Sequence, residues 1–314
     1  MPDDPQFFLT DDVPGTTPPR ELVGYGEHPP QVEWENGARV AVQIVVNYEE
    51  GSEKTFAMGD GKNDIFYELP FELDERDLAV ESFYEYGSRA GIWRLFRVFD
   101  AAGVPISCFG SAVALERNPE VGRKIAARGD ETVGHGYRWS NHFEMTRDDE
   151  REAIRLAVAS IERTTGARPL GWYCREMSVN TRELVVEEGG FLYDSDCYND
   201  DLPYWTRVVG RPHLVVPYGL VVNDVRYVVG TGFGSPDHFF ELAKAHLDRL
   251  RNDGDDVSRM MSIGLHPRIS GNPARSDGLA RFIEYAQSLD DVCFMRRIDI
   301  ARTFAAQQPA ANWI

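Results

Sequence analysis

The 314-residue sequence predicts one α/β domain built around a parallel sheet. Apolar segments of strand length alternate with amphipathic segments along the chain, and no change of composition divides them. The first apolar segment, residues 40–46, is rich in β-branched residues, which is typical of a strand buried on both faces. A distorted TIM-like (β/α) barrel is the economical arrangement for one domain of this length.

The elements follow in order after an extended arm over residues 1–36, where prolines remove backbone donors. The barrel is expected over residues 37–306, and residues 307–314 form a short tail. The predicted strands are residues 40–46, 104–109, 131–133, 169–173, 191–193, 213–217, 259–265 and 292–295. Apolar residues at helical spacing and glycine stops predict the helices 88–102, 119–128, 147–165, 180–188, 237–251, 274–288 and 298–306.

Composition excludes several classes of partner. The formal net charge is −18, with 51 acidic against 33 basic side chains, which argues against nucleic acid or an anionic membrane as partner. The four cysteines are widely spaced with no CxxC pair, so neither a zinc ribbon nor a disulfide framework is expected. The N-terminus lacks the apolar core of a signal peptide, and no run approaches the roughly 18 apolar residues of a membrane helix. A cytoplasmic location is therefore expected.

Polar side chains follow the predicted strands repeatedly. In chain order they are Glu49 and Glu50, His135, Tyr173, Asp194 and Asp196, and His266. Each alone is explained by a solvated turn, a loop cap or a satisfied core histidine. Because the carboxyl ends of parallel strands meet in one mouth, their joint placement predicts a site there.

These residues also carry a family resemblance. An acidic pair after the first strand, Gly-His-Gly-Tyr at residues 134–137 and Gly-Leu-His at residues 264–266 resemble the motif order of the polysaccharide deacetylase superfamily, whose barrel is called the NodB-homology domain. That resemblance implies a metal held by one Asp and by both imidazoles of His-x-x-x-His. Here the second imidazole is replaced by Trp139, whose indole nitrogen is a donor only, and the Asp pair is replaced by Glu49 and Glu50. The metal triad is broken.

One branch of the superfamily is similar over residues 22–305, namely the cofactor-independent allantoinases. The shared segments are residues 22–26, 47–53, 81–91, 135–139, 187–196, 200–205, 263–266 and 296–302. The resemblance implies a hydrolase of non-peptide C–N bonds that needs no cofactor and opens the ring of allantoin or a related cyclic amide or ureide. It also implies a small neutral or polar substrate from purine or ureide catabolism and a homo-oligomer, suggested to be a tetramer.

Metal-free hydrolysis requires a carboxylate that activates water and an acid for the departing nitrogen. Strand alternation turns only one of Glu49 and Glu50 inward, and we slightly favour Glu50 as the base. His266 is the expected acid, with His135 as a second acid or an oxyanion donor. The expected substrate-binding residues are Tyr137, Arg138, Trp139, Tyr173, Arg175, Glu176, Asp196 and Trp205.

The loop over residues 174–178 departs from the branch. Its arginine, Arg175, is shifted by one position, and Glu176 stands where the branch has arginine. We therefore expect Glu176 in the pocket and a substrate that differs from allantoin or binds in a changed pose, unless the loop repacks and returns Arg175 to the mouth. Two other functions stay open: a metal-dependent N-deacetylase of acetylated sugars using Glu50, His135 and His142, and a non-catalytic binding protein.

Overall fold

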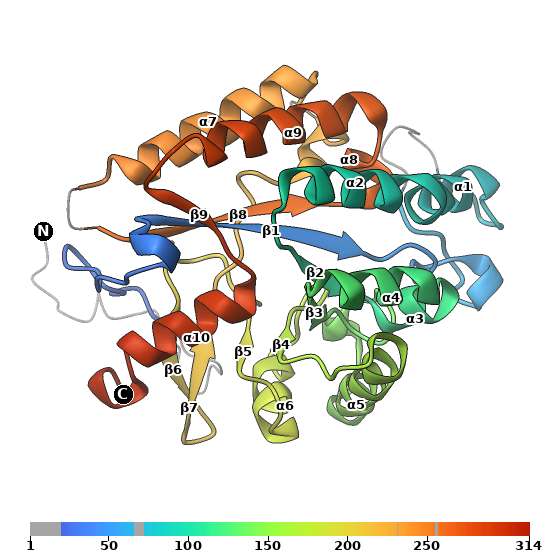
Figure 1. Cartoon of the computed structure of the whole chain (residues 1–314). Coiled ribbons are helices and arrows are strands. Elements are labelled where there is room, and N and C mark those ends of the chain that lie inside the picture. The colour runs from blue at the N-terminus through green and yellow to red at the C-terminus, as the bar shows by residue number, and fades with distance from the viewer. Residues whose placement is uncertain (1–19, 66–71, 231, 255–256) are drawn as a thin grey trace, which may run out of the picture.

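The computed structural model describes residues 20–65, 72–230, 232–254 and 257–314 (Figure 1). One sheet runs in the order β6-β7-β5-β4-β3-β2-β1-β8, with β9 paired to β1. Its strands are β1 (Val40–Tyr48), β2 (Ser107–Gly110), β3 (Glu131–Gly134), β4 (Gly171–Trp172), β5 (Tyr193–Asp194), β6 (Tyr204–Val208), β7 (Arg211–Val215), β8 (Arg259–Leu265) and β9 (Val292–Phe294).

Strand β1 is the centre of the sheet, and all nine of its residues are buried. One edge of β1 pairs with β8 in parallel from Val40 to Val46. The other edge pairs first with β9 and then, from Val45 onward, with β2. Because both edges and both faces are covered, a continuous apolar segment is the sequence that this position requires.

Helices cover the sheet, most visibly α7, α9 and α2 along one side of β1 (Figure 1). They are α1 (Leu78–Tyr86), α2 (Ile92–Ala102), α3 (Ala112–Arg117), α4 (Pro119–Arg128), α5 (Arg147–Thr165), α6 (Thr181–Glu188), α7 (Pro236–Arg251), α8 (Pro267–Ser270), α9 (Pro273–Gln287) and α10 (Arg297–Gln307). A π-helix, Gly87–Gly91, joins α1 to α2.

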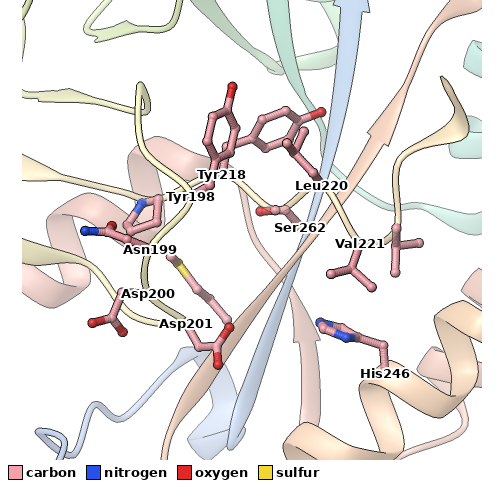
Figure 2. Close-up of a pocket in the computed structure, with 13 residues that line it drawn as sticks. Tyr198, Asn199, Asp200, Asp201, Tyr218, Leu220, Val221, His246 and Ser262 are labelled. Carbon is pink, nitrogen blue, oxygen red and sulfur yellow. The ribbon is translucent and has the colours of Figure 1, made fainter. Parts of the chain in front are cut away.

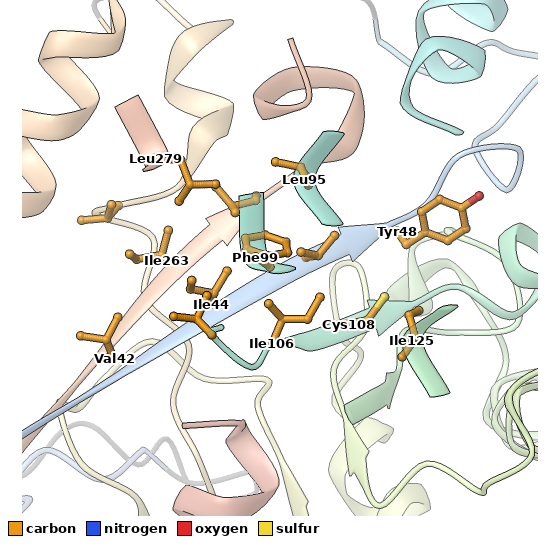
Figure 3. Close-up of a cluster of buried hydrophobic side chains, with 14 of the residues drawn as sticks. Val42, Ile44, Tyr48, Leu95, Phe99, Ile106, Cys108, Ile125, Ile263 and Leu279 are labelled. Atoms are coloured by element: carbon orange, nitrogen blue, oxygen red, sulfur yellow. The ribbon is translucent and has the colours of Figure 1, made fainter. Parts of the chain in front are cut away.

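Two apolar clusters fix the layers of the molecule. Along β1, Val42 and Ile44 belong to a cluster shared with α2, α7 and α9 (Figure 3). Ala41 and Val45, which point to the opposite face of β1, belong to a second cluster that includes residues of α10. Alternate side chains of a strand point to opposite faces, so one segment of sequence supplies both clusters.

The sheet curls without closing into a full barrel. Strand β6 pairs with β7 in antiparallel fashion and forms one end of the sheet, while β8 forms the other. The segment after β7 meets β8 at the isolated parallel bridge between Asn223 and Gly264, where the N–H of Gly264 donates to the carbonyl of Val222. The predicted α/β fold of the NodB type is confirmed, in the form of a curled half-barrel rather than a complete ring.

Most predicted elements are present near their expected limits, and α5 and β8 coincide with the prediction. The helix expected from residue 88 is longer, because α1 begins at Leu78 and continues through the π-helix into α2. Strand β6 and the short helices α3 and α8 were not predicted. Within the described ranges, none of the helices is long and apolar enough to cross a membrane.

Candidate active site

The site is built where parallel strands end, as the sequence predicts. Glu49 directly follows β1, His135 follows β3, and His266 follows β8. Strands β1 and β8 are neighbours, and β3 lies two strands away on the other side of β1. The carboxyl ends of these three strands therefore bring the three side chains together.

Glu49 is the central group, and it is only 2% exposed. Its Oε1 lies 3.1 Å from Nε2 of His135 and 3.7 Å from Nε2 of His266. Its Oε2 lies 2.8 Å from Nη2 of Arg268. Burial alone would raise the pKa of this carboxyl, but Arg268 and the two imidazoles lower it to about 2. Glu49 is thus held as a carboxylate between a guanidinium and two imidazole nitrogens.

His266 is oriented by a second acid. Its Nδ1 lies 2.6 Å from Oδ1 of Asp224, and the other oxygen of Asp224 accepts the backbone N–H of His266 at 2.7 Å. Burial opposes protonation of His266, but Asp224 and then Glu49 raise its pKa above the ordinary value. Nδ1 thus faces the carboxylate of Asp224 and Nε2 is directed to Glu49, and both carboxylates favour the imidazolium form, in which Nε2 also carries a proton.

The carboxylate of Glu50 is directed away from the histidines, so the preference for Glu50 over Glu49 as the base is not supported by the geometry. Its two carboxylate oxygens accept the backbone N–H groups of Arg268 and Glu49, at 3.2 and 3.0 Å. Gly87 of the π-helix packs so closely on this carboxyl that a Cβ there would collide with it. Burial and then the charge of Glu49, opposed by Arg268, raise the pKa of Glu50 to about 7. Geometry assigns Glu49, rather than Glu50, to the histidines.

His135 is held by Tyr173, the residue directly after β4. Its Nδ1 lies 3.0 Å from the backbone carbonyl oxygen of Tyr173, which directs Nε2 to Glu49. The ring of Tyr173 stacks on the imidazole at 5.2 Å and 19°, and its hydroxyl shares a 2.8 Å hydrogen bond with Tyr198. Tyr173 is thus brought to the site, as expected.

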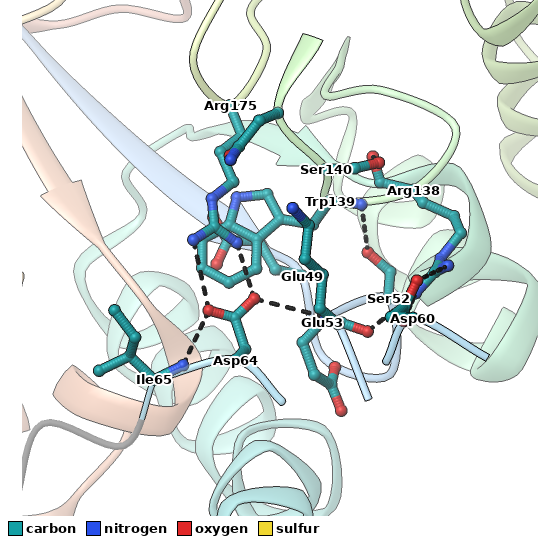
Figure 4. A network of polar contacts seen from close by, with 12 residues as sticks. Glu49, Ser52, Glu53, Asp60, Asp64, Ile65, Arg138, Trp139, Ser140 and Arg175 are labelled. Atoms are coloured by element: carbon teal, nitrogen blue, oxygen red, sulfur yellow. Dashed lines mark hydrogen bonds and ion pairs between the residues drawn. The ribbon is translucent and has the colours of Figure 1, made fainter. Parts of the chain in front are cut away.

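The altered loop returns its arginine to the mouth (Figure 4). The guanidinium of Arg175 stacks on Trp139, 3.8 Å from the ring centre, and pairs with Asp64 at 2.7 Å. Glu176 is instead exposed and has a positive φ of 40°. Glu176 is therefore not part-buried beside Trp139 as Arg175 is, and its role in binding substrate stays a prediction.

Two other expected residues of this region hold loops. Both terminal nitrogens of Arg138 contact the carboxylate of Asp60 at 2.8 Å (Figure 4), so its guanidinium ties two loops at the mouth together. Tyr137 packs against the apolar cluster of α2, α7 and α9, and its carbonyl accepts the backbone N–H of Val113. Within the described residues, neither side chain forms a hydrogen bond or an ion pair with Glu49.

Asp196 and Trp205 support the site from further away. Asp196 is buried and accepts the backbone N–H of Cys174 at 3.0 Å, so it anchors the start of the altered loop. Trp205 packs in the cluster of α10, and its indole N–H donates to the carbonyl of Gln308 at 2.7 Å. Their binding roles stay predictions.

A cavity of about 310 Å³ adjoins this group of residues (Figure 2). Tyr198 and Tyr218 line it. The hydroxyl of Tyr198 is hydrogen-bonded to that of Tyr173, and the ring of Tyr218 packs edge-on against the ring of Tyr173, which stacks on His135. Its other wall includes His246 of α7. The aromatic residues therefore separate the cavity from the histidine and carboxylate cluster.

Comparisons with known proteins agree with this architecture. A family model described as polysaccharide deacetylase matches residues 74–187. A putative polysaccharide deacetylase of Schizosaccharomyces pombe is 35% identical over 92% of this chain and 98% of its own length. The chain belongs to the polysaccharide deacetylase family.

Two solved structures of this family are especially similar to the chain. A probable polysaccharide deacetylase from Pseudomonas aeruginosa PAO1 has 46% identity and a TM-score of 0.90, over 93% of this chain and 99% of its own. PuuE allantoinase has the same identity and TM-score, over 93% and 98%. The predicted relationship to both the superfamily and its allantoinase branch is confirmed.

The metal implied by the deacetylase family does not fit these residues. Trp139 stands at the position of an imidazole ligand, and the guanidinium of Arg268 already lies against Glu49. His142, considered as a ligand with Glu50 and His135, is directed elsewhere: its Nδ1 lies 2.9 Å from Glu150 of α5. In the part of the chain that the structure describes, no three His, Cys, Asp or Glu residues are arranged to hold a metal ion.

Four residues of the site were missed from the sequence: Arg268, Asp224, Asp64 and Tyr84. Arg268 stands two residues after the histidine of Gly-Leu-His, so its proximity to the motif was the available signal. Asp224 lies in the irregular segment between β7 and α7, where no periodicity indicates which side a residue faces. Only the packing of that segment on β8 places it beside His266.

Proposed function

We propose that this amide C–N hydrolase opens the ring of a small, planar cyclic amide, allantoin or a related ureide, without a metal. The observation that carries the proposal is the carboxylate of Glu49, held between two imidazoles and a guanidinium where the family resemblance implies a metal site. The 46% identity to PuuE allantoinase over nearly the whole chain supports the same substrate class.

In this proposal Glu49 accepts a proton from water as the water oxygen attacks the amide carbon. His266 donates its Nε2 proton to the ring nitrogen as the C–N bond breaks. A carboxylate with a pKa of about 2 is a weak base, so the proton on Glu49 must pass on to His266, 3.7 Å from the same oxygen. The products are one carboxyl group and one free N–H, and both residues return to their first state.

The surroundings favour a small flat substrate. Glu49 is 2% and His266 9% exposed, so the reacting groups are almost covered, whereas a polymer requires an open groove. Trp139 and the guanidinium of Arg175 stacked on it give the mouth a planar lining, and Asp64 holds that guanidinium by both terminal nitrogens.

A metal-dependent N-deacetylase of acetylated sugars is the second candidate. It is favoured by the names of relatives, including a peptidoglycan deacetylase of Helicobacter pylori that is 32% identical over 142 residues. The donor set described above speaks against it. A binding protein without turnover is the third.

One screen separates the three functions. The full chain is assayed with allantoin, substituted hydantoins and N-acetylglucosamine oligomers, before and after chelation, and its metal content is measured. We expect ring opening that survives chelation, and a loss of about 10²–10⁴-fold in kcat for Glu49→Gln and for His266→Ala. The exposed changes Glu152→Gln and His238→Ala are the matched controls.

Other outcomes contradict the proposal. One equivalent of zinc retained against a mild chelator, together with release of acetate from the sugars, identifies a deacetylase. Turnover of no substrate in the panel favours the binding protein.

A further inference from the structure

Arg268 occupies a position that the sequence motifs do not explain. It is 5% exposed, and its Nη2 lies 2.8 Å from Oε2 of Glu49. Its Nη1 makes no hydrogen bond in the described structure and lies 3.6 Å from Oε1 of Glu50. We propose that Arg268 is a positioning residue that takes over the electrostatic task of the missing metal, fixing Glu49 as an ionised carboxylate directed at both histidines. This inference rests on the proposed function.

The guanidinium of Arg268 is held between aromatic rings. It stacks on Tyr84 of α1, 4.4 Å from the ring centre, and lies 5.2 Å from the ring centre of Trp139. Aromatic faces attract a guanidinium, most strongly where water is excluded. The indole that cannot bind a metal therefore helps to hold the cation that replaces it.

The backbone ties this cation to the proton donor. Arg268 lies in the short helix α8 directly after His266, and its backbone N–H donates to Glu50. Asp224 accepts the backbone N–H groups of both His266 and Ser270, which fixes the turn at its two ends. One turn of the chain thus carries both His266 and Arg268 and fixes their positions relative to each other.

The charges of the site require such a group. Glu49 and Glu50 are adjacent and buried, and two ionised carboxylates there would repel each other strongly. Arg268 contacts both but lies closer to Glu49, so the ionised state is favoured on the carboxyl that faces the histidines. Without this bias the proton could reside on either carboxyl, and Glu49 would lose its ability to accept one from water.

The test uses Arg268→Met and Arg268→Lys in the full chain, with ring opening measured against pH. We expect kcat/KM to fall by about 10²-fold or more in Arg268→Met, a loss comparable to that of other preorganised charges in active sites. Because Arg268 lowers the pKa of Glu49, its removal should also move the acid limb of the kcat/KM profile to higher pH. Arg268→Lys keeps the charge and should show a smaller shift.

Arg128→Met is the matched control, since Arg128 is also mostly buried and contacts two carboxylates, Asp100 and Asp130. Arg128 lies beside the starts of β2 and β3, at the opposite end of these strands from the site. The substitution should lower the melting temperature and leave the acid limb where it is. If Arg268→Met does not fold, the profile of Arg268→Lys decides alone.

An unmoved acid limb and near-normal kcat in a folded Arg268 variant would overturn this inference while leaving the proposed function intact. If the unmodified chain opens no cyclic amide, the proposed function fails first. If added guanidinium ion restores the activity of Arg268→Met and returns the acid limb of its pH profile to lower pH, the inference is supported directly. A merely structural loss would not bring the acid limb back.

Discussion

At the scale of single residues, two neighbouring glutamates of the site differ in their pKa values because their surroundings differ. Glu49 and Glu50 are neighbours with the same side chain, yet the pKa of one is lowered to about 2 and that of the other is raised to about 7. The difference comes from direction: Glu49 meets two imidazoles and the nearer nitrogen of Arg268, whereas Glu50 meets backbone N–H groups and a packed glycine. Chemistry at this site is decided by which way a side chain points.

Asp224→Asn should move the basic limb of the kcat/KM profile to lower pH. In the proposed mechanism His266 is the proton donor, so activity should fall as pH rises through its pKa, which burial lowers but Asp224 raises above the ordinary value of 6.5. The amide carries no charge, so the pKa of His266 should drop and activity should be lost earlier. The profile is measured with the best substrate, and Asp237→Asn, an exposed change, is the control. A basic limb that stays in place would remove His266 as the donor.

Glu50→Gln should become more stable relative to the unmodified chain as pH rises from about 4.5 to about 7. Burial, followed by Glu49, raises the pKa of Glu50 from 4.5 to about 7, so across this window the folded protein holds a proton that the unfolded chain has released. The unmodified chain therefore loses stability as pH rises there, whereas glutamine has no proton to lose. Urea unfolding at several pH values measures the difference. Equal pH dependence in both proteins would show that Glu50 ionises normally, and exposed Glu152→Gln supplies the baseline.

At the scale of elements, irregular pieces of backbone carry more of the site than the regular ones. The π-helix Gly87–Gly91 brings Gly87 against Glu50 and Gly91 against the backbone of Pro267. A regular helix with side chains at these positions could not approach the turn after β8, and π-helical segments are often found at functional sites for such reasons.

Gly87→Ala should therefore reduce activity more than its effect on helix propensity would suggest. Alanine is the better helix former by about 1 kcal/mol, but its Cβ would lie 2.8 Å from the backbone nitrogen of Arg268 and closer still to the Glu50 carboxylate. We expect a lower melting temperature and a fall in kcat of about tenfold or more, since the turn with His266 and Arg268 must shift. Ser82→Ala, exposed on α1, is the control. A more stable and fully active Gly87→Ala would show that this contact is not needed.

At the scale of the whole molecule, the mouth is tied together by loops from different strands. Asp64, in the chain after β1, pairs with Arg175 after β4, and Asp60 pairs with Arg138 after β3. In the described part of the chain β6 and β8 lie at opposite ends of the sheet, and these two ion pairs, with the stacked Trp139, join the loops at the entrance.

Asp64→Asn should loosen two distant loops at once. Arg175 loses a bidentate partner, so backbone hydrogen exchange should become faster both in residues 51–65 and in residues 174–178. Asp60→Asn is the matched comparison, because it should affect residues 51–65 and 136–140 and leave residues 174–178 unchanged. Faster exchange in only one of the two loops would show that the Arg175–Asp64 pair does not join them.

The sequence alone determined the α/β class, the central strand, the two long helices α5 and α7, and the placement of Glu49, His135 and His266 at strand ends. These follow from local periodicity and from the rule that parallel strands present their carboxyl ends together. Tertiary structure alone decided that Glu49 rather than Glu50 faces the histidines, that Arg175 stacks on Trp139 while Glu176 is exposed, and that Arg268 and Asp224 lie beside Glu49 and His266. The physical reason is that the directions of side chains after a strand ends are set by packing between segments far apart in the sequence, and no local pattern encodes that packing.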